Sequence, residues 1–488
     1  MRKLSKIRLM AVAVMGLLLA SCTVYDSPKA LKSWKGTSSQ NGDEIVVNQG
    51  DKLTSGGTYR NFILSGQAKT EEGATAALLF HSDGESGYKV LFHNGPEDGS
   101  RMTGSLETVR NLYSTLTNDG EWFDFTVAVR EKNIEVCVDG QAIVCYTEPS
   151  APYRTPENQG KLLSQGKFYL EGQKGSVSFR NLNVTALKDG TVNPNDTVDA
   201  LDEQTDQAIR FQQKNFPVID YHVHMKGGLT PQMTRTLSMR YGINYGVAPN
   251  TGIAITDNSI SSTTNTTAEN PLDTGMLSNN EILGRYWDAV KNMPFFHGLQ
   301  GEGRKWIIAI DREKTHMFDY LFTDAMTIVY KGQLTRMWLV KDIQKEFGLD
   351  DQAFMEMFVD QACKILTNEP ADFYANPFYI PDPLNDRFDE LWTDARVNKI
   401  LDILAETGMA LEINARYLVP SERIIKMAKA RGIKFTFGTN NADFNFGRLE
   451  YSLEMAEKCG LTVEDMWFPT MGTRFQRTPV NYNNFTID

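Results

Sequence analysis

The hydrophobic pattern of this chain changes near residue 190, and that change restricts the fold more than any other feature. From about residue 30 to 187, short alternating apolar runs are separated by Gly, Asn and Asp. Such runs predict many short strands, as in a β-sandwich of jelly-roll type. From Phe216 onward, strand-like runs alternate with amphipathic helical patterns, which predicts an α/β barrel. The sequence therefore predicts two domains of different class.

The strand signals of the first half are short and well separated. Asp139-Gly140 is typical of a tight hairpin turn and joins two alternating runs. The runs expected to be strands are Phe62–Leu64, Ala77–Phe80, Tyr88–Phe92, Phe125–Val129, Ile134–Val138 and Ala142–Cys145. Trp122 is expected to belong to the core of the sandwich rather than to form a sugar-binding platform.

Four short motifs in this half resemble the 3-keto-disaccharide hydrolase family. They are Tyr59–Phe62, Gly120–Trp122, the Asp139-Gly140 hairpin and Phe179–Asn181. The resemblance implies a concanavalin-like jelly roll over residues 23–187 and a link to carbohydrate. Lys89 stands where the family commonly has a glutamate, and His81 where it often has an arginine. Because the lost carboxylate is a possible acid or base, we expect carbohydrate binding here rather than hydrolysis; a sandwich that only packs against its neighbour is the alternative.

The second half is organised as repeated strand–helix units behind a polar linker. Residues 188 to about 205 are polar and have no apolar periodicity, and residues 188–212 are predicted to connect the jelly roll to a barrel over residues 213–488. Ala208–Lys214 is predicted to be a short helical segment that leads into the barrel. The expected strands are Phe216–Ile219, Ile243–Ala248, Pro294–Leu299, Ala410–Asn414 and Lys434–Gly438. The expected helices are Thr230–Met239, Glu281–Lys291, Asp351–Leu366, Val397–Thr407 and one capped by Ser421 that ends at Arg431-Gly432.

A histidine pair follows the first of these strands, in Asp220-Tyr221-His222-Val223-His224. Residues two apart on a strand face the same way, so His222 and His224 are expected to converge. Imidazole is the commonest protein ligand for a catalytic divalent metal. The alternative is an ordinary polar strand end. The chain has only six histidines, and two of them stand together before a Gly-Gly loop, which favours a metal or substrate site.

Three segments of this half resemble the polymerase and histidinol phosphatase (PHP) family. They are Asp220–His224, Leu411–Asn414 and Gly432–Gly438. The resemblance implies a distorted TIM-like β/α barrel that binds divalent metal ions. The bridging glutamate of the family corresponds to Glu302, with Gln300 as the other possibility, and a carboxylate bridges metals better than an amide.

The resemblance also implies an incomplete set of metal ligands. Three family histidines are replaced, with Asp324, Asn376 and Asp443 near their positions. We therefore expect either one oxygen-rich site for Zn, Mn or Fe, or none, rather than a trinuclear cluster. Because barrel chemistry lies at the carboxyl ends of the strands, the polar residues there complete the predicted site.

The predicted site residues fall into three groups by role. The predicted metal ligands are His222, His224, Glu302 and Asp443. The candidates for the general base are Asp324 and Glu412. The predicted substrate-binding residues are Lys226, Gln300, Arg304, Asn376, Asn414, Asn440 and Asn441. Several have simpler alternatives, namely a solvated loop for Glu302, a turn for the two asparagines after the last strand, and a helix cap for Asp443.

The first 22 residues are predicted to be a secretory signal. Four basic residues precede the apolar run Met10–Ala20, which is too short to span a bilayer. The segment ends in Leu-Ala-Ser-Cys and resembles the lipobox of bacterial lipoproteins, which implies a lipid on Cys22. The protein is then expected outside the cytoplasm, in the periplasm or on the cell surface, with the lipid as its only membrane contact.

Charge and cysteine spacing exclude several functions. The net charge is −11, and removal of four basic residues with the signal would lower it to −15 (−11 − 4), so nucleic acid is not an expected partner. Cys137, Cys145, Cys363 and Cys459 match neither a zinc knuckle nor a redox motif.

Three functions remain open from the sequence. The first is a metal-dependent hydrolase whose barrel acts on a carbohydrate-derived substrate. The second is a non-catalytic glycan-binding lipoprotein. The third is glycoside hydrolysis by the jelly roll, with the barrel as an accessory domain.

Overall fold

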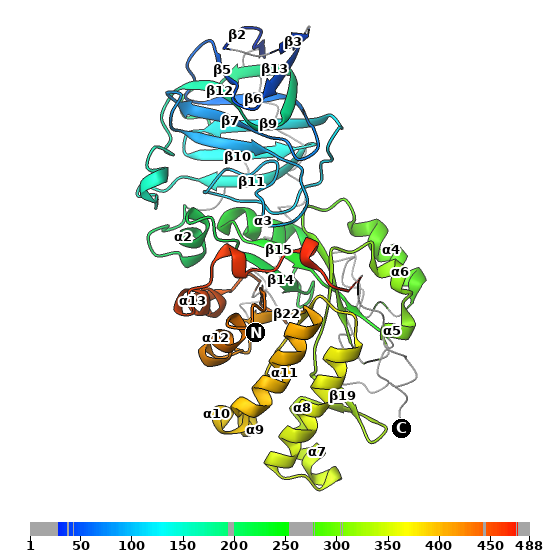
Figure 1. The fold of residues 1–488 in the computed structure, drawn as a ribbon. Helices are drawn as coiled ribbons and strands as arrows, with labels where there is room; N and C mark the ends of the chain where they lie inside the picture. Colours follow the sequence, from blue (N-terminus) through cyan, green and yellow to red (C-terminus); the bar gives the residue numbers. More distant parts are fainter. Residues whose placement is uncertain are drawn as a thin grey trace, which may run out of the picture.

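The structure is a computed structural model, and Figure 1 shows a β-sandwich stacked on an α/β barrel. The described residues are 28–36, 39–41, 43–193, 200–252, 277, 279–302, 304, 306–442, 446–474 and 476. The predicted signal, Cys22 and Asp443 lie outside them. No helix among these ranges is both long and apolar enough to cross a membrane.

The sandwich consists of two antiparallel sheets, as the alternating pattern predicts. One sheet has the order β11-β10-β9-β6-β13-β4-β3, with β1 beside β13, and the other has the order β2-β5-β12-β7-β8. Along β6, buried and half-buried residues alternate without a break, so one face of that sheet forms the core. The predicted hairpin is confirmed: β10 and β11 pair antiparallel, and Asp139 and Gly140 adopt φ values of 45° and 74°.

The elements of the sandwich have the following bounds. They are β1 Lys29–Ala30, β2 Trp34–Lys35, β3 Ser39–Asn41, β4 Glu44–Asn48, β5 Lys52–Ser55, β6 Phe62–Thr70, β7 Thr75–Ser82, β8 Tyr88–Phe92, β9 Phe123–Arg130, β10 Asn133–Val138, β11 Gln141–Thr147, η1 Pro156–Asn158, β12 Lys167–Lys174 and β13 Ser176–Ala186.

The second half is a closed parallel barrel. The order β15-β14-β23-β22-β21-β18-β17 closes on itself through pairing of β15 with β17, and β16 extends the sheet beside β17. Its strands are β14 Ile219–Val223, β15 Asn244–Val247, β16 Asn250–Thr251, β17 Phe296–Gly301, β18 Tyr320–Thr323, β21 Phe373–Tyr374, β22 Ala410–Asn414 and β23 Phe435–Gly438. The predicted TIM-like barrel class is confirmed at this level.

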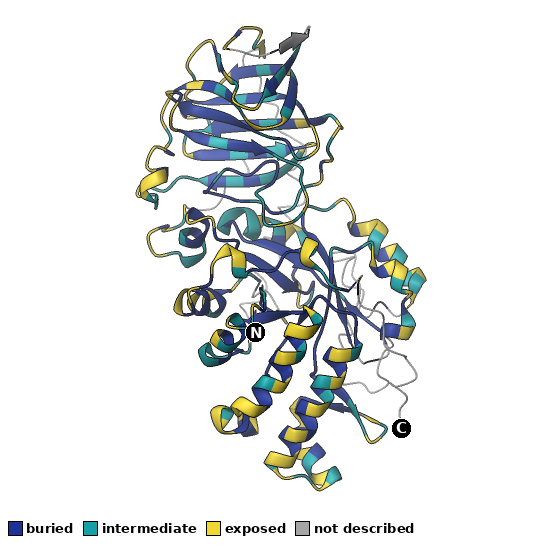
Figure 2. Cartoon of the chain, viewed as in Figure 1, coloured by how far each residue is buried: buried dark blue, intermediate teal, exposed yellow. Residues whose placement is uncertain are grey.

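Helices cover the outside of the barrel. Figure 2 shows their inner faces buried and their outer faces exposed, most clearly along α8 and α11. The α-helices are α2 Gln207–Gln213, α3 Pro231–Tyr241, α4 Asn280–Val290, α5 Trp306–Ala309, α6 Arg312–Thr315, α7 Val340–Phe347, α8 Asp351–Asn368, α9 Asp382–Asn385, α10 Phe388–Leu391, α11 Asp394–Thr407, α12 Glu422–Lys429 and α13 Glu450–Lys458. The remaining elements are the hairpin β19 Thr327–Tyr330 and β20 Gln333–Arg336 with η2 Met337–Leu339, η3 Val463–Asp465 and η4 Pro469–Met471.

An aromatic cluster fills the barrel interior. Tyr221, Tyr320, Phe373 and Trp467 pack with ring centroids 5.2 to 6.3 Å apart. The Tyr320 hydroxyl donates a hydrogen bond to the backbone oxygen of Tyr221, at 2.6 Å. The interior below the strand ends is therefore solid, and chemistry in the barrel is confined to its two ends.

The sandwich is joined to the amino end of the barrel by specific polar contacts. Asn244, at the start of β15, accepts a hydrogen bond from the Tyr113 amide at 3.1 Å and donates one to the backbone oxygen of Asn111 at 2.8 Å. Arg110 donates to the backbone oxygens of Met239 and Arg240, at 3.3 and 2.8 Å, at the end of α3. These contacts fix the sandwich against the barrel.

Three local expectations need correction. Trp122 is half-exposed and packs under Arg180 and Lys69, whose charged groups lie 4.0 and 4.8 Å from its ring, so cation–π contact holds it at the surface rather than in the core. Ser421 precedes α12 but makes no side-chain cap hydrogen bond. Part of the predicted linker is buried, because Glu203 pairs with Arg154 of the sandwich at 3.1 Å.

Candidate functional site at the carboxyl end of the barrel

Buried polar side chains from several neighbouring strands meet at the carboxyl end of the barrel. They follow or end β14, β17, β18, β21, β22 and β23. Most of the residues that the sequence singled out take part: His222, His224, Gln300, Glu302, Asp324, Asn376, Glu412, Asn414 and Asn441 are all buried.

The histidine pair lies at the end of β14. The two rings are 5.0 Å apart between centroids. His222 Nδ1 lies 2.7 Å from Glu412 Oε1, and neither side chain is exposed to solvent. Because the carboxylate accepts the Nδ1 proton, the lone pair of the neutral ring is left on Nε2. Glu412, predicted as a candidate base, thus lies where it orients His222.

Gly438 makes this pairing possible. A Cβ atom at Gly438 would overlap Glu412 Oε1 and lie 2.6 Å from the Cβ atom of His222. The last strand can therefore pass the histidine–glutamate pair only with a glycine at this position.

Asn376 is the hub of the remaining hydrogen bonds. Its amide N–H donates to Glu412 Oε2 at 2.7 Å and its side-chain Nδ2 to Asp324 Oδ2 at 3.2 Å. Its Oδ1 accepts from Asn414 and Asn440, at 2.9 and 2.8 Å. Asn376 and Asn440 have φ values of 46° and 40°, a left-handed conformation that asparagine tolerates better than most residues.

The other predicted residues extend this network on either side. Gln300 Nε2 donates to Asp324 Oδ2 at 3.1 Å. Asn441 holds the backbone of His224 through two hydrogen bonds of 2.7 Å. Glu302 accepts a hydrogen bond from the side chain of Asn250.

Arg304 and Lys226 differ in their surroundings. Arg304 is buried, and its guanidinium pairs with Glu369 at 2.9 Å and lies 4.0 Å from Asp324. This cation is therefore neutralised inside the protein. Lys226 is half-buried beside the histidine pair, where its charge acts on His224.

Burial shifts two groups of the site in opposite directions. Burial, with the charge of Lys226, lowers the pKa of His224 well below its usual value. Burial, with the charge of Asp324, raises the pKa of Glu302. The site thus holds an imidazole that stays neutral and a carboxyl group that keeps its proton to higher pH than a solvated one.

Four buried polar atoms of this network have no hydrogen-bond partner among the described residues. They are His222 Nε2, His224 Nδ1, Asn250 Oδ1 and Gln300 Oε1. A buried polar atom without a partner costs about 1–3 kcal/mol, and such atoms are uncommon in folded proteins. Their clustering in one network is what a ligand site would require.

The described residues do not by themselves form a metal centre. No group of three or more His, Cys, Asp or Glu within the described ranges is arranged to hold a metal ion. The two imidazoles offer two ligands, but a catalytic zinc site uses three from the protein. Glu302 does not join them, because its carboxylate lies against Asn250. Asp443, the remaining predicted ligand, lies outside the described residues.

Sequence reasoning missed two residues of the site. Asn250 holds Glu302, and the signal that could have revealed it is a polar residue just after the strand that ends at Val247. Asp220 accepts hydrogen bonds from the Thr439 amide and hydroxyl, at 3.0 and 2.6 Å, and so ties β14 to the loop after β23.

Comparison with known proteins identifies the class of the first domain. Residues 27–185 match the family model of the 3-keto-disaccharide hydrolases, described as a 3-keto-alpha-glucoside-1,2-lyase-like domain. This part of the chain is therefore a 3-keto-disaccharide hydrolase-like domain. The match ends before the barrel begins. No curated protein matches the chain.

Several solved structures are similar to part of the chain at low identity. Two are described as a "putative glycosyl hydrolase" from Parabacteroides distasonis, with 17% and 15% identity. They cover 33% of this chain and 91% and 100% of their own, each with a TM-score of 0.29. A third is the carbohydrate-binding module CBM66 from Bacillus subtilis, with 12% identity, 31% and 95% coverage and a TM-score of 0.25.

Proposed function

We propose that this protein cleaves a carbohydrate-derived substrate at the carboxyl end of its barrel. The observation that carries the proposal is the set of four unpaired polar atoms on His222, His224, Asn250 and Gln300 in one buried network. The 3-keto-disaccharide hydrolase-like domain supports the substrate class, because it belongs to a carbohydrate-related family. A substrate rich in hydroxyl groups would supply the missing hydrogen bonds.

The chemistry would be acid–base catalysis. The raised pKa of Glu302 lets this carboxyl group keep its proton to higher pH than a solvated one, which suits a general acid that protonates a leaving oxygen. His224 stays neutral because its pKa is lowered, so it can accept a proton. The amides of Asn376 and Asn414 lie within the same network and would position hydroxyl groups. Glu412 would hold the ring of His222 in place.

The test compares variants at the two candidate locations in the full chain. Cleavage of 3-keto-α-glucosides and of the parent disaccharides would be followed for wild type, His224→Ala, Glu302→Gln and Lys89→Ala. Among the described residues, neither His224 nor Glu302 forms an ion pair, so both variants should fold. We expect at least a 100-fold loss of rate for Glu302→Gln, and little change for Lys89→Ala. The reverse result would contradict the proposal.

Catalysis by the jelly roll is the second candidate, because the family match lies in that domain. Its two departures from the family are already paired internally. Lys89 binds Glu171 at 3.0 Å. His81 lies 2.7 Å from the backbone oxygen of Arg60, and burial lowers its pKa to about 4. These contacts favour binding over catalysis, and loss of cleavage in Lys89→Ala alone would support the second candidate.

A metal ion at the histidine pair, as the PHP resemblance implies, is the alternative to proton transfer by His224 at the same site. His222 and His224 supply two nitrogen ligands, and Asp443 is the predicted additional one. Elemental analysis of purified protein tests this directly. Stoichiometric zinc, manganese or iron that is lost in His224→Ala supports a metal site, whereas metal-free protein with full cleavage activity excludes one.

The N-terminal sequence supports anchoring by a lipid on Cys22, outside the cytoplasm. Replacement by Cys22→Ser in the native host tests it. We expect the wild-type protein in the membrane fraction with incorporated fatty acid, and the variant without it. Equal fatty-acid labelling of both proteins would contradict the proposal.

A further inference from the structure

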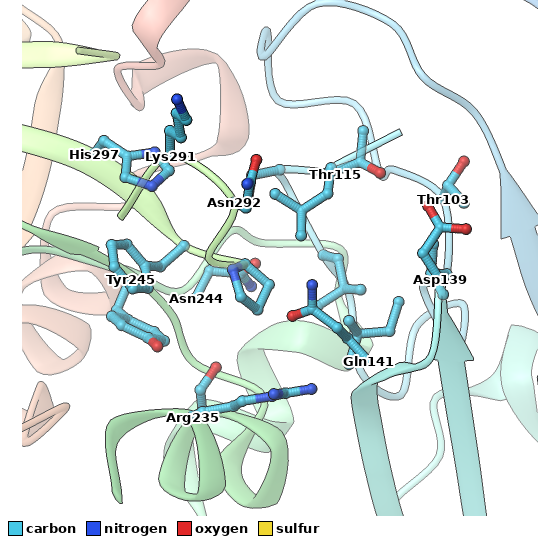
Figure 3. A pocket seen from close by; sticks show the side chains of 18 of the residues that line it. Thr103, Thr115, Asp139, Gln141, Arg235, Asn244, Tyr245, Lys291, Asn292 and His297 are labelled. Carbon is cyan, nitrogen blue, oxygen red and sulfur yellow. The ribbon is translucent and has the colours of Figure 1, made fainter. Parts of the chain in front are cut away.

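A cavity lies at the amino end of the barrel, between the two domains. Its volume is about 550 Å³, within the 300–1,000 Å³ that small-molecule sites usually occupy. On the barrel side its lining includes Asn244, Phe295 and Asp319, which lie at the beginnings of β15, β17 and β18. Figure 3 shows Thr115, Asp139 and Gln141 of the sandwich across the cavity from the barrel residues.

The walls of this cavity are held by hydrogen bonds between the domains. Arg235 of α3 donates to the backbone oxygen of Ala142 in β11, at 3.0 Å from Nε. Asn244 bonds the sandwich segment that includes Tyr113. The Thr470 hydroxyl donates to the backbone oxygen of Glu97 at 3.0 Å. Because three separate contacts fix the two sides, the cavity is preformed rather than a loose gap.

The charges that line the cavity balance one another. Arg235 and Lys291 are cationic, and Asp139 and Asp319 are anionic. Burial and the charge of Asp319 raise the pKa of Glu97 to about 9, so Glu97 is uncharged at neutral pH. His297 also lines the cavity, with its Nδ1 atom 3.5 Å from Asp319. A charged ligand would be attracted by two of these groups and repelled by the other two, so the lining gives no net preference for either sign of charge.

The uncharged part of the lining combines amides with aromatic rings. Gln141 and Asn292 present side-chain amides. Trp287 and Tyr245 are aromatic residues of the lining. Amides that form hydrogen bonds with hydroxyl groups, beside rings that pack against C–H faces, suit a neutral, hydroxyl-rich molecule. An apolar ligand would leave the amides and carboxylates unpaired.

We propose that the cavity between the domains binds a small neutral saccharide, separately from the site at the carboxyl end of the barrel. The lining from both domains, the balanced charges and the amide–aromatic composition carry this inference. It rests on the proposed function only for the carbohydrate class of the ligand. The sandwich then contributes one wall of a binding site that neither domain could form alone.

The experiment measures binding to the full chain by calorimetry and ligand-observed NMR. The probes are maltose, cellobiose and sucrose, with glucuronate and glucosamine as charged comparisons. Gln141→Ala and Asn292→Ala test the cavity, since each removes an amide at a half-buried or exposed position. His224→Ala tests the carboxyl end, and Lys89→Ala the outer face of the sandwich. Thermal unfolding verifies that each variant is folded.

We expect at least one neutral disaccharide to bind wild type. Its affinity for the double variant Gln141→Ala/Asn292→Ala should be at least tenfold lower. Lys89→Ala should bind it as wild type does, and the charged sugars should bind more weakly. Absence of binding by every neutral probe overturns the inference. So does binding that is unchanged in the cavity variants but lost in His224→Ala or Lys89→Ala.

The same data separate this inference from the proposed function. Binding through the cavity without cleavage of any carbohydrate would leave the inference standing and remove the proposed function. Cleavage that depends on Glu302, without binding in the cavity, would support the proposed function and overturn the inference.

Discussion

The two ends of the barrel treat polar side chains in opposite ways. At the carboxyl end, the polar groups are packed against one another, and His222 and Glu412 have no exposure to solvent. At the amino end, polar groups of two domains stand apart around about 550 Å³ of space. The carboxyl end holds reactive groups in fixed positions, whereas the amino end leaves a space between two domains. At the amino end, the sandwich therefore supplies part of the lining of a cavity that the barrel alone would not enclose.

The largest effect is expected from Gly438→Ala, which would disrupt the carboxyl end alone. The added methyl group would overlap Glu412 and press on His222, with a loss of about 3 kcal/mol in the free energy of unfolding. Chemical denaturation measures it. Gly284→Ala is the matched control, because its Cβ meets nothing within 4 Å in helix α4, so a gain of about 0.5–1 kcal/mol is expected there. Equal effects would show that the close approach at Gly438 is unimportant.

The next effect is expected from Arg110→Ala, which would loosen the amino end. Arg110 is buried, bonds two carbonyls at the end of α3 and stacks on Tyr146 at 4.8 Å. Its loss leaves those carbonyls unpaired, at about 2–3 kcal/mol. Arg387→Ala, an exposed ion-pair residue, should change stability by less than about 0.5 kcal/mol. Similar stability losses for the two variants would mean that the Arg110 contacts contribute little to the stability of the interface between the domains.

A smaller, pH-dependent effect is expected from Glu97→Gln. The pKa of Glu97 is raised from 4.5 to about 9 in the folded protein. Between these values the unfolded chain has lost the proton that the folded protein keeps, so the group's contribution to stability falls as pH rises. The variant should therefore be more stable than wild type at pH 8, by about 1 kcal/mol because the side chain is only half-buried. At pH 4, below both pKa values, the two proteins should agree. Denaturation at both pH values checks this, and parallel curves would contradict it.

The smallest effect is expected from Asn292→Ala. Asn292 is exposed at the rim of the cavity, so its removal should change the free energy of unfolding by less than about 0.5 kcal/mol. A stability loss above 1 kcal/mol would mean that the amide supports the interface rather than faces a ligand. The contrast between ligand binding and stability is thus sharpest at this residue.

Local patterns were sufficient for much of the barrel and for part of the site. Ala410–Asn414 was predicted and found as β22 with identical bounds, because an apolar run between a helix and a loop has few other structures. The position of His222 beside His224 follows from strand geometry. The partner of His222 does not, because Glu412 is 190 residues away and only barrel closure brings the two together.

The amino end was not predictable in the same way. The contact of Asn244 with Asn111 joins residues 133 apart on different domains, and no local periodicity records how domains dock. Trp122 was misplaced for a related reason. A large aromatic residue is expected in a core, but two cations on neighbouring strands gave it a stable place at the surface.

The bonds from Arg110 to the end of α3 also bear on how such a protein could evolve. Exchange of the sandwich for another domain would leave the backbone oxygens of Met239 and Arg240 without the hydrogen bonds that Arg110 donates. A replacement domain would therefore need its own donor for these two oxygens.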